Sequence, residues 1–290
     1  MATARLPVAR AVVCGTALVA TACAGAAGSS RFEDKARRDV PIAICRKALT
    51  TNDTTEGGQA RVDAYWSVIF PGFHGFSSPL DSTSRDCVGD PILVTDKAAP
   101  PAALTITPAD WTSTAGEDGL QAVWLRASPP APSASGALAL LRVRPAELDV
   151  YSLGAYRGSA KHSRFEFARM GATSVILAHD DSCSDATAGT ECESALLVYL
   201  VAGGELDLAA RTPAERVQSG VTKDLGRVTW RLTADPPLFD AQTMRIKEKL
   251  SVRDARDDEV RKSENERVFT LQGAALVAGS DTIWSQVPKP

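Results

Sequence analysis

Between Met244 and Arg253 the sequence alternates apolar and charged residues with a period of two. Successive side chains of a β-strand point to opposite faces of a sheet, so this pattern predicts a strand with one buried and one solvated face. Glu248 is the one charged residue on the apolar side of the pattern, which otherwise carries Met244, Ile246, Leu250 and Val252. This stretch indicates a β-rich fold.

A hairpin is predicted upstream of this strand, between residues 195 and 210. Ala195–Ala202 and Glu205–Ala210 are two apolar-rich runs that flank the pair Gly203–Gly204. Glycine adopts the positive φ angles of a two-residue hairpin turn at little cost. We therefore expect two antiparallel strands that turn at this glycine pair.

The remaining pattern is that of adjacent strands rather than strands alternating with helices. Val228–Thr233 alternates like Met244–Arg253 and is expected to pair with it across the break at Asp235–Pro237. We expect a mainly β fold, either an antiparallel meander or a sandwich- or barrel-like domain, with long loops and little helix. The mixed-charge stretch Asp254–Arg267 is expected to form a solvated loop or a short helix. Further strands are expected at Asp63–Phe70, Ile92–Thr95, Leu104–Thr107, Gln121–Arg126, Ala137–Val143 and Ser174–Ala178, and around Phe165 and Phe167.

The first 22 residues have the layout of a secretory signal peptide. Arg5 and Arg10 provide positive charge, Ala11–Ala22 is apolar and small, and no acidic residue precedes Glu33. An apolar run of 12 residues is shorter than the roughly 20 that a membrane-spanning helix needs. Residues 1–22 are therefore expected to direct export and not to anchor the chain.

The end of this segment, Ala20-Thr21-Ala22-Cys23, resembles the lipobox of bacterial lipoproteins, with Ala20 where leucine is commonest. The resemblance covers only the first two dozen residues, and no family resemblance extends to the rest of the chain. It implies a lipid on the thiol and amine of Cys23 and retention at a membrane surface. The alternative is ordinary cleavage after Ala22, which leaves a soluble exported protein with a free N-terminal cysteine.

The number of cysteines favours the lipoprotein interpretation. Removal of the signal also removes Cys14 and leaves five cysteines, whereas lipidation of Cys23 leaves an even four that can pair in an oxidising compartment. Cys183 and Cys192 enclose a polar loop between two apolar runs, which favours a local disulfide. This pairing leaves Cys45 to pair with Cys87.

The chain is expected to divide into a signal peptide (1–22), a flexible tether (23–40) and a β-rich domain (41–290). The proline-rich stretch 128–136 either separates two lobes of that domain or is a loop that joins Gln121–Arg126 to Ala137–Val143 as a hairpin. We favour the hairpin, because single β-domains of about 200 to 250 residues are common.

Charge and motif content exclude several functional classes. Lys and Arg total 32 against 35 Asp and Glu, without a basic cluster, so a nucleic-acid partner is not expected. The sequence contains no nucleophile elbow, phosphate-binding loop, dinucleotide fingerprint or zinc-binding helix motif. We expect no cofactor.

One acidic loop raises the question of a metal site. His179, Asp180, Asp181 and Asp185 lie close together around Cys183. Oxygen ligands suit calcium, and thiolates with histidine suit zinc, but the spacing matches neither pattern. The simpler interpretation is a solvated turn in which Asp and Ser side chains bond to their own backbone.

Aromatic residues concentrate between Tyr65 and Phe76 in a chain that is only 6% aromatic. Phe73, His74 and Phe76 either line a small pocket or cap one end of the β core, and capping is the favoured interpretation. A Ser, His and Asp set for acyl transfer is the sharper alternative. The nearby hydroxyl and carboxylate residues are Ser77, Ser78, Asp81 and Asp86.

Arg245, Lys247, Lys249 and Arg253 occupy the solvated side of the first predicted strand. Such a row of cations can meet phosphates or acidic sugars at a cell surface. Long cationic side chains also prevent unwanted pairing of an edge strand. Edge protection or plain solvation is the favoured interpretation.

Together these features predict a lipid-anchored exported protein on the periplasmic or outer face of a bacterial envelope, such as the outer membrane. Its expected role is that of a non-catalytic binding or structural module, held to the membrane through Cys23, with the protein or glycan partner left open. The competing hypothesis is an exported hydrolase that uses His74 with nearby Ser and Asp residues.

Overall fold

The computed structural model describes residues 42–78, 80, 85–90, 106–127, 133–186 and 190–288. Residues 41–290 form one compact unit. The signal segment, Cys23, the tether, Asp81 and the strand expected at Ile92–Thr95 lie outside the described residues. Half of Leu104–Thr107 also does, and its described residues Ile106 and Thr107 are not in a strand. No helix within the described ranges is long and apolar enough to cross a membrane.

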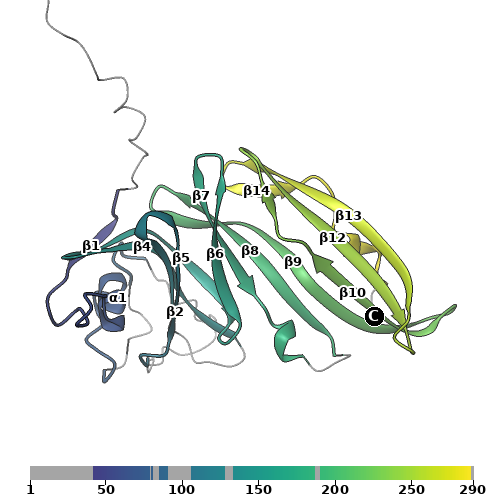
Figure 1. The fold of residues 1–290 in the computed structure, drawn as a ribbon, viewed down its shortest axis with the longest axis horizontal. Helices are drawn as coiled ribbons and strands as arrows, with labels where there is room; N and C mark the ends of the chain where they lie inside the picture. Colours follow the sequence, from purple (N-terminus) through teal and green to yellow (C-terminus); the bar gives the residue numbers. More distant parts are fainter. Residues whose placement is uncertain are drawn as a thin grey trace, which may run out of the picture. The chain divides into compact units, whose positions relative to one another are not determined.

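Fourteen strands form one large open sheet, so the expected mainly β fold is confirmed (Figure 1). The first block contains β1 (Cys45–Ala48), β2 (Trp111–Ala115), β3 (Leu120–Arg126), β4 (Ser133–Arg144) and β5 (Glu147–Ser159). The middle block contains β6 (Ser163–Met170), β7 (Thr173–Asp180), β8 (Cys192–Ala202) and β9 (Glu205–Thr222). The last block contains β10 (Gly226–Ala234), β11 (Leu238–Phe239), β12 (Thr243–Asp254), β13 (Glu259–Gln272) and β14 (Ala275–Ala278). The helical turns are α1 (Val62–Ile69), η1 (Glu117–Gly119), η2 (Cys183–Asp185) and η3 (Ile283–Gln286).

The strand order is β14-β13-β12-β10-β9-β5-β4-β3-β2. Strands β8, β7 and β6 continue from β9 as a separate antiparallel branch, while β1 pairs with β5 and β11 with β12. Among the described strands, one pair is parallel: β5 and β9, which pair at Leu153 and Glu205. The rest is the antiparallel meander that the sequence predicts.

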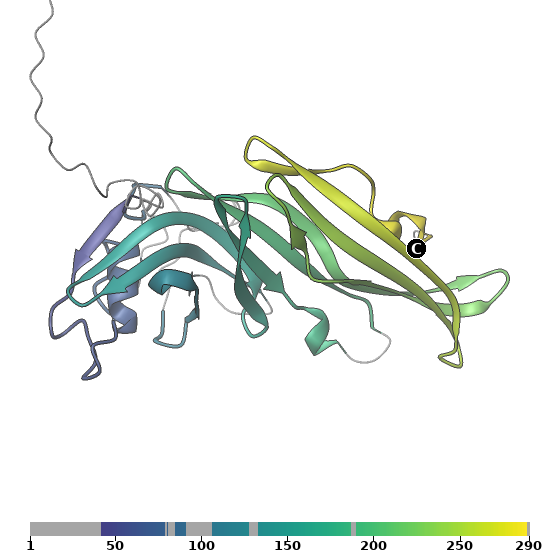
Figure 2. The same cartoon turned by 45° about the horizontal axis from the view of Figure 1, so that its top comes forward.

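The branch β6–β8 packs against a different block of strands on each of its faces. Ile176 and Tyr199 belong to a core shared with β3, β4 and β5. Val175 and Val198, their neighbours along the chain, belong to a core shared with β12, β13 and β14. Burial on both faces explains why β7 and β8 are continuous apolar runs, and Figure 2 shows the branch between the other two blocks.

Several local expectations are confirmed by the pairing register. Gly203 and Gly204 have φ angles of 59° and 97° and connect β8 to β9, with Ala202 opposite Glu205. Strands β10 and β12 pair antiparallel from Val228 opposite Asp254. Strands β3 and β4 form the hairpin favoured for the segment around 128–136.

Two expectations about secondary structure are wrong. The segment Asp63–Phe70 is not a strand but belongs to the helix α1, which ends at Ile69 and has Phe70 as its C-cap. Tyr65, Trp66 and Ile69 form the buried face of this helix against β3–β5. A short continuous apolar run does not distinguish a helix from a strand, which is why the sequence misleads here. Asp254–Arg267 is mostly strand, because β12 ends at Asp254 and β13 begins at Glu259.

A buried ion pair links β12, β13, β9 and the C-terminal turn. Glu248 is fully buried, and its Oε1 accepts a hydrogen bond of 3.0 Å from Nη1 of Arg267. Its Oε2 accepts bonds from the Thr282 hydroxyl at 2.9 Å and the Ile283 N–H at 2.8 Å. Arg267 also donates to the Thr212 hydroxyl at 3.1 Å. The one charge on the apolar side of β12 is therefore fully satisfied.

Both expected disulfides are present. Cys45 in β1 is joined to Cys87, with a Cα–Cα distance of 6.2 Å. Cys183 in η2 is joined to Cys192 at the start of β8, with a Cα–Cα distance of 5.2 Å. The first bond closes a separation of 42 residues, so it restricts the unfolded chain more than the local bond does.

We predict that Arg267→Met lowers the free energy of unfolding by about 3 to 5 kcal/mol, because it leaves the Glu248 carboxylate buried without its counter-charge. Urea titration followed by circular dichroism measures this loss. The matched control is Arg261→Met on the same strand, where the side chain is exposed and the change should stay within about 0.5 kcal/mol. Equal stability of the two variants would contradict the prediction.

Candidate functional site

The candidate site is a pocket of about 280 Å³ between the β6–β8 branch and the end of β10. It lies at the C-terminal end of β7 and the N-terminal end of β8, where β9 continues past both strands. Its walls are largely short apolar side chains and prolines, and its polar groups come from the ends of the strands. The walls include Leu196, Pro213, Ala214, Ala234, Pro236 and Pro237.

His179 is the titratable group most affected by this position. Burial lowers the pKa of His179 from its usual 6.5, against the opposing effect of nearby Glu166. The Nε2 atom lies 3.5 Å from Oε1 of Glu166 on β6, which is too long for a strong hydrogen bond. His179 is therefore held neutral at neutral pH and keeps hydrogen-bonding capacity at the pocket.

The acidic residues around the pocket already have partners. Asp180 accepts a 2.8 Å hydrogen bond from the N–H of Ser159. Glu215 lies 2.6 Å from Arg231, and Asp235 lies 2.7 Å from Lys249. Glu215 and Asp235 are thus paired with cations, whereas Asp180 is bonded to a neutral N–H through one oxygen.

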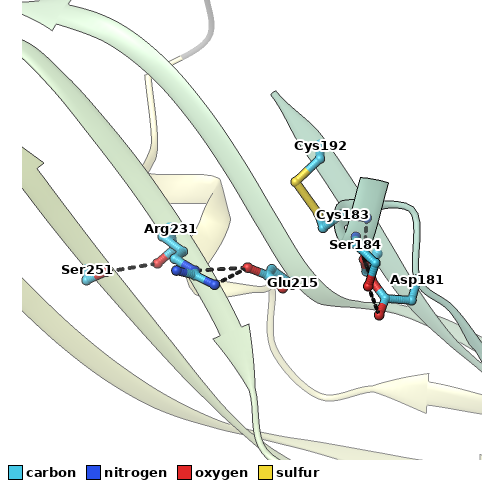
Figure 3. A network of polar contacts seen from close by, with 8 residues as sticks. Asp181, Cys183, Ser184, Cys192, Glu215, Arg231 and Ser251 are labelled. Carbon is cyan, nitrogen blue, oxygen red and sulfur yellow. Dashed lines mark hydrogen bonds and ion pairs between the residues drawn. A yellow bond between two sulfur atoms is a disulfide. The ribbon is translucent and has the colours of Figure 1, made fainter. Parts of the chain in front are cut away.

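Asp181 organises the turn below the local disulfide (Figure 3). Its Oδ2 accepts the Ser184 hydroxyl at 2.6 Å, and its Oδ1 accepts the Ser194 hydroxyl at 2.9 Å. Burial acts to raise the pKa of Asp181, but these hydrogen bonds outweigh it and the pKa is lowered. The Ser194 oxygen in turn accepts the Cys183 N–H at 3.0 Å. The loop is the self-bonded turn of the simpler interpretation.

The candidate metal ligands do not converge. Within the part of the chain that the structure describes, no group of three His, Cys, Asp or Glu side chains is placed to hold an ion. His179 faces Glu166, Asp180 bonds Ser159 and Asp181 bonds Ser184. The side chain of Asp185 lies outside the described residues.

Some residues around His74 are buried in the core, and the others are exposed at the surface. Phe73 is buried, and its ring lies 5.6 Å from that of Trp66 and 5.2 Å from that of Phe76. His74 itself is exposed, as are Ser77 and Ser78. No hydrogen bond among the described residues joins His74 to a serine or an aspartate.

The Asp86 side chain stabilises the turn in which it lies. This buried carboxylate accepts the N–H of Val88 at 3.0 Å and of Asp90 at 2.8 Å. It is thereby committed to the loop around Cys87, whose disulfide attaches the loop to β1.

The basic face of β12 is neutralised by partners along its length. Lys247 lies 2.7 Å from Glu264 of β13, Lys249 lies 2.7 Å from Asp235, and Arg253 lies 3.0 Å from Asp257. Arg245 lies 3.9 Å from Asp240. β12 is an interior strand between β10 and β13, so protection of an exposed edge does not explain these cations. Lys247 pairs with the neighbouring strand β13, whereas the other three cations pair with aspartates in turns, and together these contacts form an ion-pair ladder along β12.

Sequence reasoning identified His179 but missed the pocket beside it. Thr212–Glu215 and Thr233–Pro237 form much of the wall, and neither range carries a recognised motif. The available signals were Pro213 within a strand and the double proline at 236–237, because proline disrupts regular pairing and marks irregular places in a sheet.

No family model matches the chain, and no curated protein or solved structure matches it either.

We predict that the melting temperature falls as the pH is lowered from about 7.5 to about 5.5, in part because of His179. The pKa of the folded state lies below 6.5, so the unfolded chain takes up the proton first and stability is lost with acidification. His179→Gln should reduce this slope in calorimetry at several pH values. The matched control, His74→Gln at an exposed position, should leave it unchanged, and identical slopes for both variants would refute the role of His179.

Proposed function

We propose that this chain is an exported lipoprotein, held at the envelope surface by a lipid on Cys23, that binds a small ligand. The observation that carries the anchoring part is the cysteine pairing. Cys45–Cys87 and Cys183–Cys192 use four of the five cysteines downstream of the signal segment. Cys23 is the one that remains, at the position where the lipobox resemblance puts the modified residue.

The proposed position of the protein follows from the proposed lipid on Cys23. Residues 23–40 separate Cys23 from the compact unit that begins at Pro41, and small residues followed by charged ones are typical of a tether. The folded unit would then stand at the periplasmic or outer face of a bacterial membrane.

The ligand-binding part rests on the pocket at His179. Its walls are largely apolar, Glu215 and Asp235 are paired with cations, and Arg164 and His179 are among its lining residues. A volume of about 280 Å³ lies just below the roughly 300 Å³ at which small-molecule sites start. The pocket therefore suits a compact ligand with an apolar body and one anionic or hydrogen-bond-accepting group.

Binding suits this site better than catalysis. The Ser194 hydroxyl donates to Asp181, so it is not activated by His179, and nucleophilic catalysis needs a base within hydrogen-bond reach of the nucleophile. The exposed position of His74, without a partner among the described residues, gives no support to the hydrolase hypothesis.

We predict that Cys23→Ser moves the protein from the membrane pellet to the soluble fraction of exporting cells, because one serine hydroxyl replaces the proposed lipid attachment site. Fractionation followed by immunoblotting measures the distribution. The matched control is Cys14→Ser inside the signal, which should leave the protein in the pellet. An unchanged distribution of the Cys23→Ser variant would defeat the lipid anchor and leave the pocket hypothesis intact.

We predict that benzoate, an apolar ring with one carboxylate, shifts the imidazole resonances of His179 in an NMR titration. The chain has three histidines, so His179→Gln assigns the signal and His74 and His162 serve as internal controls. Ala214→Phe should fill the pocket and abolish the shift. Equal shifts at all three histidines, or a shift that survives Ala214→Phe, would contradict binding at this pocket.

A further inference from the structure

Strand β13 leaves part of one edge without a partner. Its inner edge pairs with β12 along nearly its whole length, but on its outer edge β14 covers only Phe269–Gln272. Among the described residues, no strand pairs with the outer edge of Glu259–Glu266. Figure 1 shows β13 running beside β12 at this border of the sheet, beyond the reach of the short β14.

One hydrogen bond establishes which residues present their backbone groups to the open edge. The N–H of Gly279 donates to the carbonyl of Val268 at 2.8 Å on the side of β14. Backbone groups of successive residues alternate between the two edges of a strand. Lys262, Glu264 and Glu266 therefore direct their N–H and C=O groups outward, whereas Val260 lies in the irregularity where the register with β12 shifts.

The side chains of these residues lie on the exposed face of the sheet. Their neighbours Arg267 and Phe269 are buried on the opposite face, whereas Lys262 and Glu264 are 54% and 38% exposed. The order along the strand is a cation followed two residues later by an anion. This order is self-complementary when the strand meets an antiparallel copy of itself.

Two constraints select one register for such a pairing. A twofold axis at Glu264 would place Glu264 opposite its own copy and Val260 opposite Val268, where Gly279 already occupies the edge. An axis at Lys262 would place two lysines opposite each other, and like charges directly opposite are destabilising. An axis at Ser263 places Lys262 opposite Glu264 twice and leaves β14 undisturbed.

We propose that a second copy of this chain docks on β13, strand against strand and antiparallel, with the twofold axis at Ser263. The backbone groups of Lys262 and Glu264 in both copies form the centre of the new ladder. Charged residues usually keep sheet edges apart, but in this register each faces its opposite. Glu264 already lies 2.7 Å from Lys247 and 3.4 Å from Lys262, so the second copy extends an existing ion-pair ladder.

Cysteine cross-linking of the full chain tests the register directly. Ser263→Cys should give a disulfide-linked dimer on non-reducing gels after mild oxidation, because opposed residues of a non-hydrogen-bonded pair have Cα atoms about 4.5 Å apart. Val260→Cys is the matched control, since its own copy would lie about 20 Å away. We expect at least about tenfold more dimer from Ser263→Cys, above the background of the parent chain with Cys23.

Charge reversal gives a second, independent readout in the Ser263→Cys background. Lys262→Glu places like charges opposite each other and should abolish the cross-link, and the double reversal Lys262→Glu with Glu264→Lys should restore it. Circular dichroism melting checks that each variant remains folded.

Equal cross-linking of Ser263→Cys and Val260→Cys would indicate random collision and overturn the proposal. Absence of any dimer, or a band that contains another protein in place of a second copy, would overturn it as well. Retention of the cross-link in Lys262→Glu would reject the register. None of these outcomes bears on Cys23 or on the pocket at His179.

Discussion

The structure depends on the burial of β7 and β8 on both faces. Alternate side chains of these strands enter two separate cores, one shared with β3–β5 and the other with β12–β14. Because every residue of such a strand must fit one core or the other, the two strands hold the first and last blocks of the sheet in a definite relation. The pocket at His179 lies where this double burial ends and the strands become polar.

The charged residues of β12 and β13 lie in two different environments. On the solvated face, cations of β12 lie beside anions of β13 and of the turn after β10, and such exposed pairs contribute little energy individually. On the buried face, Glu248 and Arg267 are fully hydrogen-bonded, and loss of either partner leaves a charge in the core. The buried pair therefore matters to stability, whereas the surface ladder chiefly influences which strands fit side by side.

Much of the fold was predictable where one physical signal dominated. Alternation identified β10 and β12, and the glycine pair identified the β8–β9 hairpin. The polar loop between Cys183 and Cys192 identified the local disulfide and left Cys45 to pair with Cys87. The helix α1 was not predictable, because Tyr65–Phe70 is too short and too apolar to show a period. β13 was obscured by its charges, which an exposed strand tolerates as well as a loop does. The pocket was not predictable, because its wall combines five strands that meet only in the folded chain.

The last turn of the chain has a consequence for the timing of folding. Ile283, Trp284 and Val287 complete the core over Val228, Trp230 and Leu250, and Thr282 completes the hydrogen bonds of Glu248. A nascent polypeptide therefore cannot close this core until the segment Thr282–Val287 has left the ribosome. A chain that stops before Ile283 would leave tryptophan and valine side chains of this block open to water.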